Sequence, residues 1–396
     1  MKILFVCHRF PFPPRRGGKI RPFNIISHLS RNHEVTVASI VRSDTEAHAG
    51  EGLKDYCSNY LMGKISKPAA LKNILKTLPT SIPFSMGFFY SRELDEQIKK
   101  ERSGKKYDLI FVHCSSVAQY VEDITDTPKI LDFGDMDSQK WLLYSMVRSF
   151  PMKKVFSIEG KRLQQAEMAL AKKFDFCTCT TKAEMATLKG YNVTDNIDWF
   201  PNGVDTDYFS YDQTPYEPDT LCFIGRMDYY PNQQCMIDFC EKVLPLIKSE
   251  RPDIRLMIVG ADPSRSIKKL GSIKGVTVTG SVPDVRPYLR KCAVNVAPIE
   301  IARGTQNKIL ESLAMGIPVV TTNVAAEGVD AQPGEHFLVG SNHEEFAEAV
   351  IRLLTERELR QRLSEAGRNR MLDRHNWPSS MKKLDSIIEK TLTLRK

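Results

Sequence analysis

The sequence of 396 residues lacks any run of about eighteen apolar residues, the length that a membrane-spanning helix requires. The first ten residues, MKILFVCHRF, contain a short apolar stretch and no small-residue cleavage site. We therefore expect a buried strand there rather than a signal peptide. The C-x-x-C spacing of zinc and redox sites is absent, and the nine cysteines are an odd number. Reduced, buried thiols in a cytoplasmic protein fit this pattern best.

Signatures of nucleic-acid binding are also absent. No basic run alternates with aromatic residues, and no zinc-finger or RNP-like pattern occurs, so we expect no nucleic-acid partner. The 56 basic residues exceed the 48 acidic ones and give a net charge of +8. This charge favours an anionic partner, such as a phosphorylated substrate or an anionic membrane surface. Peripheral binding to the inner face of the cell membrane is therefore left open.

Two series of alternating strand and helix signals divide the sequence near residue 205. In the first half, short apolar runs lie at 2–7, 34–40, 108–114, 129–133 and 175–180, with helical patterns such as 20–31 and 156–173. In the second half, apolar runs lie at 221–225, 255–260, 276–280, 293–298, 318–322 and 337–340, with helical patterns at 232–248, 285–291, 306–315 and 344–354. Alternation of this kind predicts parallel sheets with helices on both faces.

We therefore predict an α/β fold of two doubly wound, Rossmann-like domains, comprising residues 1–205 and 206–375. Pro201 and the Asn202-Gly203 turn mark the linker between them. Residues 376–396 are predicted to form a C-terminal helix that packs back on the first domain. The carboxyl ends of both sheets are expected to face a central cleft, because open α/β sheets bind ligands at that edge.

The segment ARGTQNKILESLAMG, residues 302–316, combines a glycine, a cation and a carboxylate at the start of a predicted helix. Gly304 removes a side chain, and the helix is expected to begin at Thr305 or Gln306. Its free N–H groups and dipole would bind an anion such as a diphosphate. Lys308 and Glu311 are three residues apart and so share one face. The cation could neutralise phosphate while the carboxylate accepts hydrogen bonds from sugar hydroxyls. The alternative is a surface ion pair that contributes roughly 0.2–0.5 kcal/mol.

Two tripeptides near the middle of the first half resemble known motifs by chance. DFG at 132–134 lacks the other kinase motifs, and DMD at 135–137 does not fit a metal-dependent glycosyltransferase, because the rest of the chain predicts two strand-helix series. We predict instead that Asp137 or Ser138 caps the helix that begins near QKWLLY.

Five segments resemble the glycosyltransferases of family 4. In chain order they are PRRGGKIRPFNIISHLSRNHEVTV, FPNGVDTDYF, FIGRMDYYPN, VTVTGSVPDVRPYLRKCAVNVAP and KILESLAMGIPVVTT. The resemblance implies the GT-B fold and retention of anomeric configuration. ARGTQNKILESLAMG and DSQKW further resemble the bacterial sugar transferases associated with exopolysaccharide and PEP-CTERM/exosortase systems.

The resemblance assigns roles to individual residues of the second half. Glu311 corresponds to the final glutamate of the family's E-x7-E motif, which holds the donor ribose. The first glutamate would fall at Gly304, so backbone amides from Gly304 to Gln306 are expected to make some of the contacts to the donor sugar. Arg226 corresponds to the arginine that binds the donor diphosphate, whereas Pro231 replaces the usual lysine.

The resemblance also reaches the first half. Gly17 and Gly18 correspond to the family's glycine-rich loop after the first strand, which contributes to donor binding. His113 corresponds to a histidine near the transferred sugar. Considered alone, His113 would more simply be a core histidine with satisfied hydrogen bonds.

Together these assignments imply a retaining, metal-independent glycosyltransferase of the hexosyltransferase type, with catalytic roles for Arg226, Lys308 and His113. The co-substrate would be a nucleotide-diphosphate sugar, with no cofactor. The acceptor would be a glycan or lipid-linked sugar in exopolysaccharide or related surface-polysaccharide synthesis. Two alternatives remain open, namely a sugar-nucleotide 2-epimerase of the same fold and a non-catalytic protein that binds nucleotide sugars.

Overall fold

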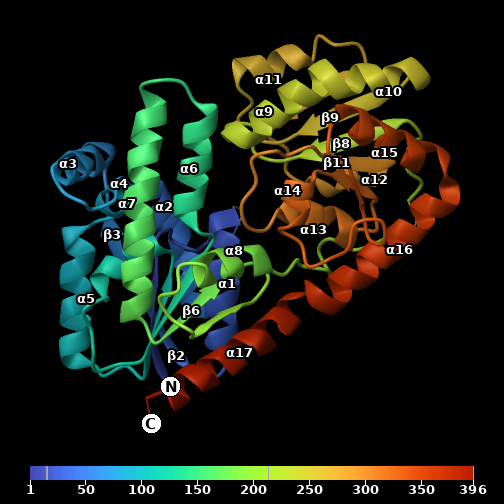
Figure 1. The fold of residues 1–396 in the computed structure, drawn as a ribbon. Helices are drawn as coiled ribbons and strands as arrows, with labels where there is room; N and C mark the ends of the chain where they lie inside the picture. Colours follow the sequence, from blue (N-terminus) through green and yellow to red (C-terminus); the bar gives the residue numbers. More distant parts are fainter. Residues whose placement is uncertain (15–16, 213, 396) are drawn as a thin grey trace. The chain divides into compact units, whose positions relative to one another are not determined.

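The computed structural model describes residues 1–14, 17–212 and 214–395. The chain divides into two compact units (Figure 1): unit 1 comprises Met1–Phe200 with Met381–Lys396, and unit 2 comprises Pro201–Ser380. Each unit contains one parallel sheet between helices, which confirms the predicted pair of doubly wound domains. Among the described helices, none is long and apolar enough to cross a membrane.

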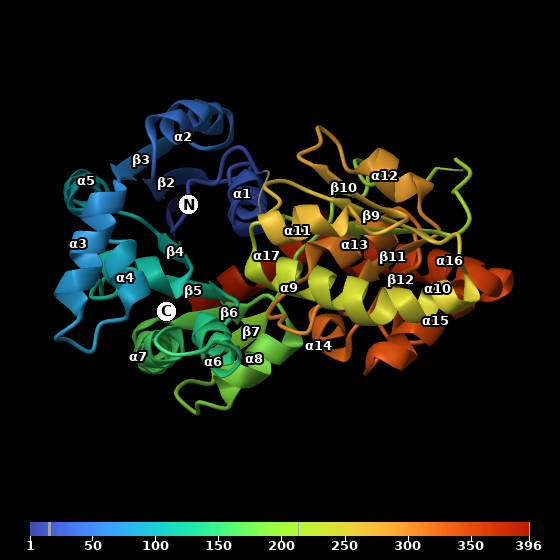
Figure 2. The same ribbon diagram turned by 90° about the horizontal axis from the view of Figure 1, so that it is seen from above.

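The sheet of unit 1 has seven parallel strands in the order β3-β2-β1-β4-β5-β6-β7. They are β1 (Lys2–Cys7), β2 (Glu34–Val41), β3 (Asn59–Lys64), β4 (Leu109–His113), β5 (Lys129–Gly134), β6 (Phe176–Cys179) and β7 (Ile197–Trp199). The helices are α1 (Gly17–Leu29), α2 (Asp44–Ala49), α3 (Lys67–Thr77), α4 (Phe84–Phe88), α5 (Arg92–Gly104), α6 (Asp137–Val147), α7 (Met152–Lys173) and α8 (Lys182–Lys189), with short 3₁₀ turns at Gly50–Tyr56 and Ser115–Tyr120. The central strands lie between α5 and α1 (Figures 1 and 2), so both of their faces are buried.

Alternate residues of each central strand enter different cores. Leu4 and Val6 of β1 pack in the core that Leu94 of α5 and Leu170 of α7 complete. Phe5 points to the other face and stacks on Phe111 of β4, with ring centroids 5.2 Å apart. A fully buried side chain of this kind stabilises the fold by about 1.5–3 kcal/mol, so the apolar strand runs visible in the sequence determine the sheet.

Unit 2 contains six parallel strands in the order β10-β9-β8-β11-β12-β13. They are β8 (Thr220–Ile224), β9 (Arg255–Val259), β10 (Val276–Gly280), β11 (Val294–Ala297), β12 (Val319–Thr321) and β13 (Leu338–Val339). The helices are α9 (Tyr230–Asp238), α10 (Leu244–Glu250), α11 (Arg265–Leu270), α12 (Arg286–Lys291), α13 (Asn307–Ala314), α14 (Asn323–Ala326), α15 (His343–Thr355) and α16 (Arg357–Arg374). The single helix predicted at 232–248 is interrupted by a π-helical turn at Phe239–Val243, because Pro245 has no N–H for a regular α-helical bond.

Both sheets reverse their strand order next to their first strand. In unit 1 the reversal lies between β1 and β4, and in unit 2 it lies between β8 and β11. Ligands of open α/β sheets bind outside the carboxyl ends of the strands at such a point. His113 ends β4, and Gly225 and Arg226 directly follow β8. The topology therefore puts sequence-predicted site residues at the ligand-binding position of each sheet.

The C-terminal helix α17 (Trp377–Thr393) begins in unit 2 and ends in unit 1. Within unit 1, Asp385 of α17 accepts a hydrogen bond from His28 of α1, with Nε2 and Oδ1 2.8 Å apart. Lys383 Nζ lies 3.5 Å from Asp198 Oδ1, and Arg395 Nε donates to Asp175 at 2.8 Å. Polar contacts between residues 383 and 395 therefore hold this end of the chain on unit 1.

The predicted cap of α6 is wrong. Met136 precedes the helix and makes no side-chain capping bond, and Asp137 is already helical. The backbone N–H and the hydroxyl of Ser138 both donate to Glu167 of α7, at 3.0 and 2.5 Å. Burial raises the pKa of Glu167 to about 8. Glu167 of α7 thus accepts the hydrogen bonds of the polar groups at the start of α6. No local pattern near Ser138 could indicate a partner so distant in the sequence.

Candidate functional site

The ammonium group of Lys308 lies at the carboxyl end of β8. Lys308 belongs to the first turn of α13, and its Nζ donates a hydrogen bond to Oδ1 of Asn232 in α9 at 2.7 Å. Nδ2 of Asn232 donates in turn to the backbone carbonyl of Arg226 at 2.8 Å. The ammonium also lies 4.5 Å from the ring centroid of Phe223. Asn232 thereby links the Lys308 ammonium to the backbone of Arg226.

The structure excludes the simple surface ion pair between Lys308 and Glu311. Both side chains are half-buried, and no ion pair joins them within the described residues. Burial lowers the pKa of Lys308 to about 8 and raises that of Glu311 to about 7. The Glu311 carboxyl makes no hydrogen bond to any described residue. Its oxygens are therefore available to the hydroxyl groups of a ligand.

The start of α13 carries polar groups without protein partners. The helix begins at Asn307, two residues later than the earliest predicted start, and Gln306 makes no side-chain capping bond. Thr305 Oγ1 and Asn307 Oδ1 are buried and, in the part of the chain that the structure describes, have no hydrogen-bond partner. Unsatisfied buried polar atoms are rare. Beside an uncapped helix start they indicate a site for a ligand rich in oxygen atoms.

Gly304 is needed here for its backbone conformation. Its φ is +62°, in the left-handed region that favours glycine. Gly328 packs against it so closely that an added Cβ at residue 328 would lie 2.2 Å from the Gly304 carbonyl oxygen. The correspondence of Gly304 with the family's first glutamate needs correction. In an E-x7-E motif that ends at Glu311, the seven intervening residues are 304–310, so the first position of the motif falls at Arg303. An arginine, rather than a missing side chain, therefore occupies that position.

Arg226 is held by two carboxylates. Its Nε and Nη2 donate to Asp228 at 3.0 and 2.7 Å, and Nη2 also reaches Asp262 at 2.5 Å. The hydrogen bond to Asp228 raises the pKa of Arg226. The guanidinium is fixed at the edge of the sheet by these contacts, and a bound diphosphate would share or replace them.

In unit 1, His113 belongs to a buried network. Its Nδ1 lies 2.7 Å from Oδ2 of Asp132, which is fully buried in the neighbouring strand β5. Arg21 of α1 binds both oxygens of Asp132, at 2.8 and 3.0 Å, and Thr178 donates to Oδ1 at 2.9 Å. Burial alone would raise the pKa of Asp132, but the Arg21 charge and the His113 hydrogen bond hold it well below its usual range.

The geometry of this network orients the imidazole. Because Asp132 engages Nδ1, Nε2 of His113 is the ring nitrogen left without a partner among the described residues. The ring of His8, which follows β1, lies 5.8 Å from that of His113, and burial lowers the pKa of His8 well below its usual value. A Cβ at Gly18 would lie 3.3 Å from Arg9 Cδ and 3.9 Å from His8 Nε2. Gly17 and Gly18 form the first turn of α1 and are exposed, so the start of α1 lies beside the histidines.

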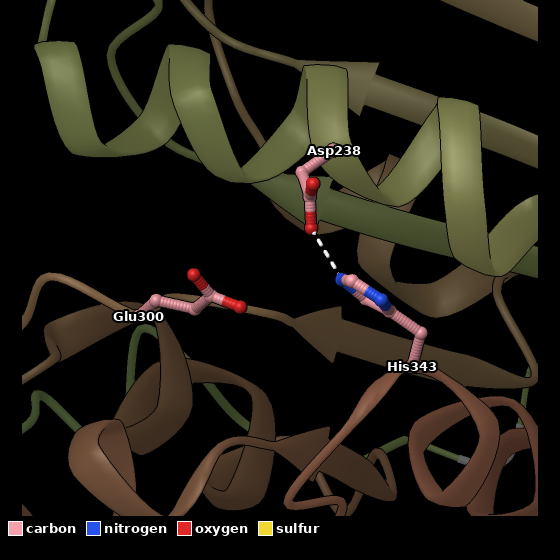
Figure 3. Close-up of side chains that lie close together, drawn as sticks. All are labelled: Asp238, Glu300 and His343. Carbon is pink, nitrogen blue, oxygen red and sulfur yellow. Dashed lines mark hydrogen bonds and ion pairs between the residues drawn. The ribbon is translucent and has the colours of Figure 1, made fainter.

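Three further side chains of unit 2 converge in a way that the sequence analysis did not predict (Figure 3). Asp238 ends α9, His343 begins α15 and Glu300 follows β11, and their possible ligand atoms all lie within 4.8 Å of one another. His343 Nε2 lies 2.7 Å from Asp238 Oδ2, while Lys242 Nζ lies 2.5 Å from the other oxygen. Two carboxylates and an imidazole could hold a divalent cation, which would compete with Lys242 for Asp238.

Comparison with known proteins gives a family match in the second half of the chain. Residues 218–356 match the family described as "Glycosyl transferases group 1". The match lies entirely within unit 2. The matched region contains Arg226, Asn232, Lys308 and Glu311, so the cluster at the carboxyl end of β8 lies inside the part of the chain that resembles this family.

Longer similarities extend over nearly the whole chain. The chain is 22% identical over 368 residues to an uncharacterized 44.6 kDa protein in the cps region of Klebsiella pneumoniae, covering 88% of this chain and 90% of that protein. Sucrose-phosphate synthase from Thermosynechococcus elongatus has a similar structure, with a TM-score of 0.74, 15% identity and 100% of both chains covered. Anabaena Alr3699/HepE in complex with UDP and glucose gives a TM-score of 0.70, with 13% identity and coverage of 98% of this chain and 100% of that chain. The chain therefore has the GT-B fold.

The structure places Lys308 and Glu311 on α13, links the Lys308 ammonium through Asn232 to the backbone of Arg226, and places Gly18 and His113 near His8 in unit 1. Asn232 and Asp132 were missed as partners. Asn232 directly follows Pro231, where the usual lysine is absent, and Asp132 is in register with His113 on the adjacent parallel strand. The positions of Asn232 after Pro231 and of Asp132 in its strand are visible in the sequence. They indicate contacts with Lys308 and His113 only when the order of the strands is known.

Proposed function

We propose that the chain is a retaining glycosyltransferase that moves a sugar from a nucleotide-diphosphate sugar to a glycan or lipid-linked acceptor in surface-polysaccharide synthesis. The observation that carries the proposal is the position of the Lys308 ammonium at the switch point of unit 2, where Asn232 links it to the backbone of Arg226. The group 1 match of unit 2 and the UDP and glucose bound by Alr3699/HepE support a nucleotide-sugar donor. The relative in a cps region and the resemblance to exopolysaccharide-associated transferases support a surface polysaccharide as product.

The chemistry of the donor explains why two fixed cations are needed. When the bond between sugar and diphosphate breaks, the sugar becomes oxocarbenium-like and negative charge grows on the leaving diphosphate. In this proposal Arg226, Lys308 and the N–H groups at the start of α13 stabilise that charge. They are fixed before the reaction, so they need no reorganisation. The proposal therefore requires no metal ion for turnover, and chelation by EDTA should leave activity unchanged.

The remaining assigned residues bind and orient. Glu311, with its free carboxylate, accepts hydrogen bonds from the donor ribose. Thr305, Gln306 and the backbone at Gly304 contact the donor near its diphosphate. From unit 1, His113 presents Nε2 to the transferred sugar while Asp132 fixes the ring, and Gly17 and Gly18 allow the start of α1 to approach the donor.

A thermal-shift screen with a panel of nucleotide-diphosphate sugars tests the donor first. A donor at about 100 times its dissociation constant should stabilise the protein by roughly 2.7 kcal/mol. The selected donor is then incubated with and without lipid-linked and soluble glycan acceptors, and the products are separated by mass spectrometry. Acceptor-dependent release of nucleoside diphosphate with a new glycosidic product is expected. A free epimerised sugar formed from donor alone would identify a 2-epimerase, and binding without any turnover would identify a nucleotide-sugar-binding protein.

A further inference from the structure

Exposed apolar side chains gather in two segments of unit 1. The first is α3 and the residues after it, and the second is the connection between α6 and α7, where Phe150 is 79% and Met146 74% exposed. The nine exposed residues are Leu71, Leu75, Leu78, Ile82, Met146, Val147, Phe150, Met152 and Val155. We call them the apolar surface. A protein in water gains nothing from such residues, so their clustering indicates a partner.

The orientation of α3 is the reverse of that of an ordinary surface helix. Leu71, Leu75 and Leu78 are spaced four and three residues apart and thus form one stripe, and this stripe faces solvent. The opposite side buries Ala70 and Thr77. Arg162 of α7 donates to the backbone carbonyls of Thr77 and Leu78 at 3.0 and 3.1 Å. These bonds fix the end of α3 against α7, so the outward stripe is built into the fold.

The charged residues within the two segments have one sign. No aspartate or glutamate occurs between residues 56 and 92 or between residues 138 and 158. Exposed cations flank both segments, namely Lys67, Lys72 and Lys76 on α3 and Arg148, Lys153 and Lys154 at the α6–α7 connection. Apolar side chains mixed with lysine and arginine complement a bilayer that contains anionic lipid, where the cations contact phosphate and the apolar groups enter the acyl boundary.

Both segments leave the carboxyl edge of the sheet. α3 follows β3 and α6 follows β5, and the α6–α7 hairpin extends beyond this edge of unit 1 on the same side as α3 (Figures 1 and 2). His113 lies at the same edge, at the end of β4. A membrane bound to the apolar surface would therefore face the edge of the sheet at which His113 lies.

We propose that α3 and the α6–α7 connection form a docking surface for anionic lipid bilayers, and that the apolar surface inserts at the level of the headgroups. The inference rests on the proposed function in that a lipid-linked acceptor would be presented at this surface. It specifies the side chains that contact the membrane. Net charge alone would predict binding through any basic face of the molecule.

Vesicle sedimentation of the full chain tests the proposal, with vesicles of pure phosphatidylcholine and of phosphatidylcholine containing phosphatidylglycerol. Two variants alter the surface, Met146→Ser with Phe150→Ser and Lys153→Glu with Lys154→Glu. All four side chains are exposed, so folding should be retained. Controls in unit 2 are Leu246→Ser with Leu372→Ser, which also replaces two exposed apolar side chains by serine, and Lys268→Glu with Lys269→Glu, which makes the same charge reversal at other exposed lysines.

The wild-type chain should bind the anionic vesicles at least tenfold more tightly than the neutral ones. Each surface variant should lose about tenfold in partitioning, and the controls should keep it. Equal loss in the Lys268→Glu with Lys269→Glu control would overturn the proposal, because net charge alone would then explain binding. Undiminished vesicle binding of the Met146→Ser with Phe150→Ser variant would also overturn it. The same holds if light scattering shows a wild-type dimer that becomes a monomer in this variant while vesicle binding is unchanged, because the surface would then be a contact between copies of the chain. The donor-induced thermal shift of each variant is measured in parallel. If no donor produces a thermal shift in the wild-type protein, the proposed function is refuted, whereas the result on membrane docking still stands.

Discussion

Replacement of Lys308 by alanine tests whether Lys308 is a catalytic cation or only a surface charge. Two opposing effects on stability can be derived from the structure. Lowering of the Lys308 pKa from 10.5 to about 8 means that the fold disfavours the ammonium by about 3 kcal/mol, and alanine removes this penalty. Alanine also removes the charge-assisted hydrogen bond to Asn232, which contributes about 1.5–3 kcal/mol. The two nearly cancel, so we expect the free energy of unfolding to change by about 1 kcal/mol or less.

The effect on the rate should be much larger. Loss of one fixed donor that stabilises a developing negative charge costs about 3–4 kcal/mol, so Lys308→Ala should lower turnover by about 10²–10³-fold. Lys308→Met keeps the length of the side chain without its charge and should lose as much. Lys308→Arg should recover part of the activity because it restores the charge, although Gly225 and Asn232 leave little space for a guanidinium.

The assay is acceptor-dependent release of nucleoside diphosphate at saturating donor, together with chemical denaturation of each variant. Arg352→Ala serves as the control, because Arg352 and Glu356 form an exposed helical ion pair in the same unit. This control should change stability by a few tenths of a kcal/mol and leave turnover unchanged. A Lys308→Ala protein within threefold of wild-type turnover would refute the reasoning and make Lys308 a structural residue.

Three further predictions concern the titratable groups. First, kcat/KM should follow a narrow bell-shaped pH profile. It should rise as Glu311 ionises near pH 7 and fall as Lys308 loses its proton near pH 8, and Lys308→Arg should move only the alkaline limb to higher pH. Second, Glu311→Gln should raise the donor dissociation constant about tenfold and increase stability at pH 8 by about 1–3 kcal/mol. The raised folded pKa of Glu311 stabilises the wild type only at low pH, and this contribution is lost as pH rises from 4.5 through 7, so denaturation at pH 4 should show no gain. Third, His113→Ala should lower turnover by about 10²-fold with an unchanged donor-induced thermal shift, whereas Asp132→Asn should cost about 3–5 kcal/mol of stability, because it leaves Arg21 buried without its partner.

The strands were largely predictable because their signal is local. β1 and β10 have the predicted bounds, and the other predicted strands differ by one or two residues at their ends. The edge strand β3, with sequence NYLMGK, and the three-residue β7 were missed. β3 is only partly buried, so it lacks the continuous apolar run that marks a central strand of a parallel sheet. Local apolar runs therefore predict the interior of the sheets better than their edges.

The sequence could select candidate site residues but not the contacts that hold them. The sequence selected Lys308 and Glu311 from their spacing, with a surface ion pair between them as the alternative. The structure instead joins Lys308 to Asn232, a residue on another helix. Contacts of this kind depend on which strands are neighbours, and the order of β8 beside β11 follows from the packing of the whole unit. The convergence of Asp238, Glu300 and His343 was hidden for the same reason.

Titration calorimetry of nucleoside diphosphates tests the central claim most directly, which is that unit 2 binds a diphosphate through Arg226 and Lys308. The panel comprises UDP, GDP, ADP and dTDP with their monophosphates, and the proteins are the wild type, Lys308→Ala and Arg352→Ala. One diphosphate should bind the wild type and Arg352→Ala equally and more tightly than its monophosphate, and its dissociation constant should rise at least tenfold in Lys308→Ala. Failure of every diphosphate to bind at millimolar concentration, or equal affinity of the wild type and Lys308→Ala, would contradict the account.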